Sequence, residues 1–294
     1  MTQFHALTAA EVEGTKKAIK SLSSQGWAIP ILANLDRAGG IKIETMPLLF
    51  EIRFAAALLR AGVVPAYEAE GIGRTTVDFL FGEQPRWLVE LFSLGETEAA
   101  RAATWSDGTT FGRLLTSPKA PGTAEVGLDQ EERVRWRRES AQSEEGEIVK
   151  AVERIIAKAT NADSAPTKFP PPGGDTFSML VVDSRSLLNG GDCYDRREIA
   201  FGSEAIPHQW RHDWIANDGT ALPIRGVFDP KNQSRRAQSF RDRVHFLVFI
   251  AEKSYATDEI AKTARHKANP RFFEGETDAS AALRMFPLFR PDGT

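Results

Sequence analysis

The chain has a single cysteine, Cys193, among its 294 residues. One cysteine can form no intramolecular disulfide and no thiolate zinc cluster, which favours an intracellular, cytoplasmic protein. No apolar run approaches the roughly 18–20 residues that a membrane-spanning helix needs, and residues 1–20 lack the apolar core of a signal peptide. We therefore expect no membrane association and no disulfide-stabilised secreted fold.

The chain also has no excess of positive charge. It contains 37 Lys and Arg residues and 40 Asp and Glu residues, which gives a net charge of −3. A basic footprint over the whole surface is excluded, so any nucleic-acid site must be a local patch. Internal repeats, low-complexity tails and a lysine-bearing phosphate loop are also missing. The pair Gly71 and Gly73 lacks the third glycine of a dinucleotide fingerprint. With 41% hydrophobic and 26% charged residues, the composition is that of an ordinary globular protein.

The hydrophobic pattern alternates between helical and extended periods along the chain. Apolar residues at helical spacing predict helices over 8–24, 45–60, 129–140, 144–160 and 232–241. Alternating or continuous β-rich runs predict strands over 63–68, 75–81, 87–92, 177–183, 224–228 and 244–251. This order predicts an α/β fold with a mixed central β-sheet flanked by helices.

Three regions are expected along the chain. Residues 1–44 form an N-terminal helical segment, 45–250 form the α/β core, and 251–294 form a tail that packs on this core. A proline- and glycine-rich stretch at 166–176 cannot be helix or inner strand, so it is expected to be a crossover within the core or a linker.

Three carboxylates carry the most informative signal. Glu51 lies in the expected buried helix, Asp78 in the second strand and Glu90 in the third. Asp78 and Glu90 are separated by one turn, so a hairpin register can bring them side by side. Two adjacent buried acids repel one another and lose solvation, and a hard divalent cation relieves both costs. Each acid taken alone fits a solvent-facing position better; the three together favour a metal site.

With these residues the chain resembles the PD-(D/E)XK nuclease superfamily, which has the restriction-endonuclease fold. The resemblance covers a buried helix with Glu51, the meander with Val77-Asp78-Phe79, the strand Val89-Glu90-Leu91-Phe92, a long helix, and the strand Met179–Asp183. It implies a restriction-endonuclease-like core and a metal-dependent phosphodiester hydrolase, endonuclease-like, that acts on nucleic acid. In this resemblance Asp78 and Glu90 are ligands of Mg²⁺ or Mn²⁺, and Glu51 is an auxiliary ligand.

One departure from the family pattern concerns the lysine two positions after the second acid. Phe92 occupies that position, and an aromatic ring carries no charge and donates no hydrogen bond. Either the cation has moved to the following helix, or the fold has lost catalysis and is a binding or scaffold module. For the first case we predict Lys150 as the catalytic cation, ahead of Arg154 and Lys158, against the alternative that Lys150 pairs with a neighbouring glutamate on a solvated face.

Basic clusters suggest where nucleic acid, in particular DNA, would bind. Arg133 and Arg137 lie in the expected helix over 129–140, and Arg235 and Arg236 lie in the one over 232–241. The competing interpretation is a charge-balanced helix for the first cluster and a solvated helix for the second, which has few compensating acids. The sequence leaves the oligomeric state open, a homodimer included.

Overall fold

The computed structural model describes residue 7 and residues 9–95, 104–106, 111–113, 144–184, 187, 191–215, 221–250 and 260–289. Its helices are α1 (Ala9–Leu22), α2 (Ile29–Arg37), α3 (Met46–Arg60), α6 (Glu144–Ala159), α7 (Cys193–Phe201), α8 (Arg235–Arg241), α9 (Ile260–Thr263) and α10 (Glu276–Arg284). Its main strands are β1 (Ala66–Glu70), β2 (Thr76–Phe81), β3 (Arg86–Ser93), β6 (Thr176–Asp183), β9 (Phe246–Ile250) and β10 (Ala264–Ala268). Two short hairpins, β4 (Thr104–Ser106) with β5 (Phe111–Arg113) and β7 (Asp213–Ile215) with β8 (Ala221–Pro223), form separate sheets.

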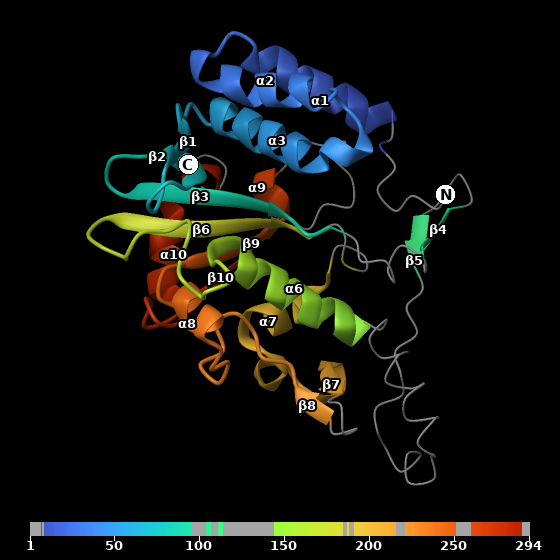
Figure 1. The fold of residues 1–294 in the computed structure, drawn as a ribbon, viewed down its shortest axis with the longest axis vertical. Coiled ribbons are helices and arrows are strands. Elements are labelled where there is room, and N and C mark those ends of the chain that lie inside the picture. The colour runs from blue at the N-terminus through green and yellow to red at the C-terminus, as the bar shows by residue number, and fades with distance from the viewer. Residues whose placement is uncertain are drawn as a thin grey trace.

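The six main strands form one mixed sheet in the order β1-β2-β3-β6-β9-β10. The three strands β1 to β3 make an antiparallel meander, β3, β6 and β9 run parallel, and β10 closes the edge antiparallel to β9. Helices α1, α2 and α3 lie over one face, and α6, α7 and α8 lie over the other (Figure 1). The predicted class, a mixed central sheet flanked by helices, is confirmed.

Each face of the sheet has its own hydrophobic core because strand side chains alternate between the two faces. Trp87, Val89 and Leu91 of β3 belong to the core under α3, whereas Leu88 belongs to the core under α6. Helix α3 is almost wholly apolar on its inner side, with ten buried residues, so it packs as a buried helix across the meander.

Two predicted elements differ from the structure or lie outside it. The helix expected over 129–140 falls outside the described residues, and Arg133 and Arg137 fall there with it. The strand expected over 224–228 is wrong. Instead, the backbone N–H groups of Val227 and Phe228 donate to the carbonyls of Ile199 and Ala200 at the end of α7. The apolar run therefore satisfies a helix C-terminus instead of joining a sheet.

The C-terminal region is more than a packed tail, since β10 is a strand of the main sheet and α10 contributes to the core on the α3 side. In the described part of the chain, no helix combines the length and the apolar character that crossing a bilayer requires.

A buried histidine at the start of β9 predicts how stability depends on pH. The ring of His245 stacks on Phe272 with centroids 4.2 Å apart, and its Nδ1 accepts a hydrogen bond from the Ser178 backbone N–H. Burial lowers the pKa of His245 to about 4. The folded state therefore favours the neutral ring, and this contribution to stability is complete above the unfolded pKa of about 6.5 and is lost as pH falls from there to about 4.

We expect the free energy of unfolding to fall by up to about 3 kcal/mol through this one group between pH 6.5 and 4. Urea unfolding of the parent and of His245→Asn across this range measures it, with His208→Asn at an exposed position as the control. The stability difference between His245→Asn and the parent must shrink as pH falls. A difference that stays constant with pH would contradict this role for His245.

Candidate active site

The site is centred on Glu90, whose side chain is 0% exposed in the middle of the sheet. Its neighbours Val89 and Leu91 pack on the α3 side, so alternation directs Glu90 to the side of α6. There its Oε1 lies 2.8 Å from Nζ of Lys158 and 3.0 Å from Nζ of Lys168. A carboxylate buried this deeply is costly unless cations accompany it, and the chain supplies two.

Asp78 lies beside Glu90 because the pairing of β2 with β3 brings the two together. Phe79 pairs with Val89, and the same register continued by one residue sets Asp78 against Glu90. The Leu91 backbone N–H donates to Asp78 Oδ2 at 2.6 Å, so this carboxylate takes a place that a strand carbonyl would otherwise hold. Burial, followed by the negative charges of Glu90 and Glu51, raises the pKa of Asp78 to about 8.

Regular alternation breaks at Asp78. Val77 belongs to the core on the α6 side, whereas Phe79 belongs to the core on the α3 side, although two residues along a strand normally share a face. Across the pair, Glu68 of β1 has a positive φ, a left-handed conformation that is rare outside glycine. Such irregularities in strands are frequently found next to active sites, where they redirect a side chain.

Glu51 approaches the same region from α3. The Tyr67 hydroxyl donates to Glu51 Oε2 at 2.8 Å and accepts from the Asn34 amide at 3.2 Å. Burial raises the pKa of Glu51, and the hydrogen bond from Tyr67 and the charge of Lys158 partly offset this effect. Glu51, Phe92 and Lys158 line a cavity of about 220 Å³ between the first half of α3 and the end of β3.

The three carboxylates interact electrostatically, since the charges of Glu90 and Glu51 both raise the pKa of Asp78. Within the described ranges, however, no group of three or more His, Cys, Asp or Glu side chains is placed to hold one metal ion. The expected set of three metal ligands is therefore not assembled. Asp78 and Glu90 lie side by side on adjoining strands, and Glu51 lies at the wall of the cavity.

The predicted catalytic cation, Lys150, is not the lysine that the structure brings to Glu90. Lys150 is 37% exposed and forms an ion pair with Glu147 at 3.8 Å, whereas Lys158 on the same helix reaches the carboxylate. Lys150 and Lys158 are eight residues apart on α6. That separation corresponds to a rise of about 12 Å and a rotation of about 80° beyond two full turns, so the two side chains cannot reach the same carboxylate. Burial lowers the pKa of Lys158, but the charges of Glu90, Asp78 and Glu51 outweigh it and the net pKa is raised.

Lys168 was missed by sequence reasoning. It lies in the crossover between α6 and β6, and its Nζ also donates to the Thr76 carbonyl at 2.8 Å. The side chain of neighbouring Phe169 is only 1% exposed and anchors this irregular stretch. The sequence signal available for Lys168 was its position beside an aromatic residue and before a run of prolines. The spacing along the chain did not predict that this lysine would contact Glu90 of β3.

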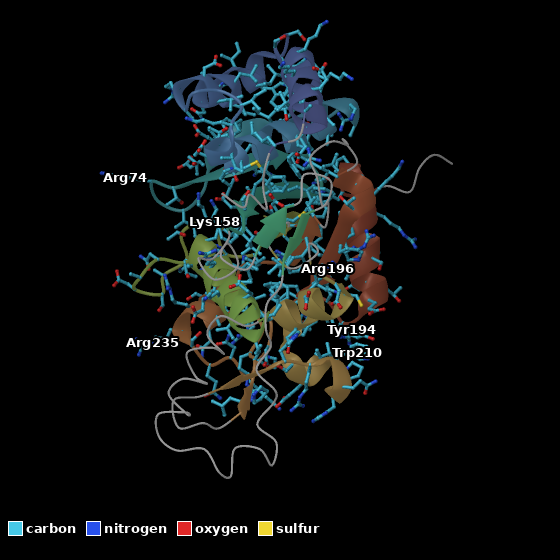
Figure 2. The ribbon with its side chains drawn as sticks, turned by 90° about the vertical axis from the view of Figure 1, so that its right-hand side faces the viewer. Arg74, Lys158, Tyr194, Arg196, Trp210 and Arg235 are labelled. Carbon is cyan, nitrogen blue, oxygen red and sulfur yellow. The ribbon has the colours of Figure 1, made fainter. Side chains whose placement is uncertain are left out.

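Two further arginines were predicted to contact nucleic acid. Arg235 begins α8 and is exposed, and Arg236 donates from Nε to the Asn161 carbonyl at 2.9 Å. Arg74, Lys158 and Arg235 lie along the same side of the molecule in the view of Figure 2. Of the two arginines, Arg235 is exposed and Arg236 is half-buried.

Comparison of the chain with protein-family models, with curated proteins and with solved structures finds no match.

Proposed function

We propose that the protein is a divalent-metal-dependent phosphodiester hydrolase that acts on nucleic acid, with DNA as the first substrate to test. The observation that carries this proposal is the site around Glu90. The buried carboxylate of Glu90 meets two lysines, and the half-buried Asp78 lies beside it on the adjoining strand, next to a cavity that Glu51 lines.

The order of elements also supports the proposal. A buried helix (α3), an antiparallel meander (β1 to β3), a helix (α6) and a strand parallel to β3 (β6) follow one another. This is the order that the resemblance to the PD-(D/E)XK superfamily implies, with the acids on the corresponding elements. A restriction-endonuclease-like core is accordingly part of the proposal.

The residues present suit a hard divalent cation. Glu90 Oε1 carries both ion pairs, while its buried Oε2 accepts no hydrogen bond from the described residues. An unsatisfied buried carboxylate oxygen next to a second carboxylate is a favourable ligand pair, since Mg²⁺ is commonly held by one or two carboxylates with waters and substrate phosphate completing its shell. Asp78 and Glu90 would hold Mg²⁺ or Mn²⁺.

When bound, such a cation lowers the pKa of a water molecule and neutralises charge on a phosphate. The chain itself supplies the remaining positive charge. Lys158 lines the cavity with its ammonium group anchored at Glu90, so it can donate to a phosphate oxygen as negative charge develops there. Lys168, tied to Thr76 and Glu90, holds the crossover against the start of β2.

A second cavity, of about 420 Å³, continues outward from the first and shares Phe92, Ser93 and Lys158 with it. Arg154 lines this outer cavity, and its guanidinium donates to the Gly95 carbonyl. An arginine next to an aromatic side chain suits the phosphate and base of a neighbouring nucleotide. We propose this cavity as the path of the strand on one side of the cleaved bond.

The experiment is incubation of the purified chain with supercoiled plasmid, single-stranded DNA and RNA, with Mg²⁺, with Mn²⁺ and with chelator. We expect metal-dependent cleavage of at least one of these substrates that chelator abolishes. The same cleavage in the presence of chelator would contradict a role for the metal.

A catalytically silent binding module is the second candidate, because Phe92 replaces the family lysine and the two lysines already neutralise the site. A parent protein that binds DNA in a gel-shift assay but never cleaves it with any divalent metal would establish this candidate and exclude the hydrolase.

A further inference from the structure

A separate cavity of about 420 Å³ lies at one edge of the sheet, beside edge strand β10 and between α7 and α10. In the sheet order, strands β6 and β9 separate β10 from β3. The cavity shares no lining residue with those at Glu51 and Arg154. Its chemistry is therefore independent of the proposed hydrolase.

Positive charge dominates the lining of this cavity. Arg197 from α7 and Lys267 from β10 both line it, and His266 lies beside them. The one acidic residue among the described lining residues is Glu276. In the described part of the chain, no hydrogen bond or ion pair holds the Lys267 ammonium group. Burial, then the charges of Arg197 and Arg196, lower the pKa of Lys267. The cluster thus repels itself, and an anion would relieve that repulsion.

The remaining wall is aromatic and firmly held. Phe201 and Phe273 line the cavity together with Pro270. Behind them, Phe201 contacts Phe228 with ring centroids 6.2 Å apart, and Phe273 contacts Phe246 at 4.8 Å. A flat apolar group would therefore meet a preformed surface.

Charged residues on an edge strand also have a simpler use, since they discourage pairing with another chain. A charged side chain protects an edge strand in this way only when its charged group is exposed to solvent. Lys267 is half-buried, and its side chain lines a concave site. Edge protection accounts for Arg265, which is exposed, but not for the half-buried Lys267. Arg197 is exposed and its Nε donates to the Ala205 carbonyl at 2.8 Å, so its two terminal nitrogens are the groups that would meet a ligand.

We propose that this cavity binds a small phosphate monoester that carries a flat aromatic group, as in a nucleoside monophosphate. Arg197 and Lys267 would take the phosphate, and Phe201 and Phe273 would contact the base. Glu276 would accept hydrogen bonds from sugar hydroxyls. Gly275 precedes α10 without a side-chain cap, so the first N–H groups of that helix add to the positive end of the site. The volume lies in the range of small-molecule sites.

The test is isothermal titration calorimetry of the full chain, without divalent metal, against adenosine monophosphate, adenosine and inorganic phosphate. We expect saturable binding of adenosine monophosphate with one site per chain, weaker binding of inorganic phosphate and none of adenosine. Lys267→Met keeps most of the stem and should weaken binding at least tenfold, which corresponds to about 1.4 kcal/mol. Arg74→Met removes an exposed charge near the other edge of the sheet and should leave binding unchanged.

Thermal unfolding of both variants verifies that they are folded. Absence of binding by the folded parent at millimolar adenosine monophosphate would overturn the proposal and leave the charges as edge protection. Inorganic phosphate binding as tightly as the nucleotide would overturn the role of the aromatic wall. Equal weakening by Lys267→Met and Arg74→Met would show a nonspecific charge effect and would overturn the site.

Discussion

Replacement of Asp78 by asparagine is expected to reduce metal-dependent cleavage by more than about 10³-fold while the protein stays folded. Asparagine keeps an oxygen that can accept from the Leu91 N–H, so the local strand pairing is preserved. It removes a carboxylate whose burial beside Glu90 is unfavourable in the metal-free protein. Stability without metal should therefore be unchanged or higher.

Cleavage of a labelled substrate under saturating Mn²⁺ measures the activity, and thermal unfolding measures the stability. Asp36→Asn, an exposed acid on α2, is the matched control and should cleave as the parent does. A folded Asp78→Asn protein with the parent's cleavage rate would place the chemistry elsewhere.

Lys158→Met is expected to lower the turnover number by about 10²–10³-fold, the loss typical when one group that stabilises developing charge is removed. Methionine fills most of the volume of the lysine stem, and Lys168 remains 3.0 Å from Glu90 Oε1 to balance the buried carboxylate. The affinity for the metal should change little, because the two proposed ligands are intact.

The matched control is Lys150→Met, a lysine of the same helix that is 37% exposed and paired with Glu147. Turnover measured with both variants separates the two positions. An equal loss for Lys150→Met, or no loss for Lys158→Met, would contradict the assignment of the cation. A loss confined to the KM for DNA would make Lys158 a binding residue only.

Local patterns were sufficient to predict the meander. The alternation in β2 and the glycine-bearing turns on either side of it fix three strands, and a one-turn separation then places Asp78 next to Glu90. The buried helix α3 and the long helix α6 follow from their apolar stripes in the same way. These elements carry both proposed metal ligands.

Neither the lysines that contact Glu90 nor the edge strand β10 could be predicted from the sequence, because both depend on how the elements pack in three dimensions. Residues 150, 154 and 158 recur every four positions, but each step turns about 40° beyond a full turn of helix, so only docking on the sheet decides which one meets Glu90. Lys168 comes from an irregular segment without any period. Strand β10, with the sequence Ala-Arg-His-Lys-Ala, has no alternating pattern and exists because β9 offers an open edge.

Metal binding by the Asp78–Glu90 pair is tested by a Mn²⁺ titration of the full chain, followed by electron paramagnetic resonance of the free ion and repeated with Asp78→Asn and Glu90→Gln. We expect one Mn²⁺ per parent chain at the Asp78–Glu90 pair, and loss of that site in both variants while each remains folded. Binding of Mn²⁺ that is unchanged in both variants, or no saturable binding by the parent, would contradict metal binding by this pair.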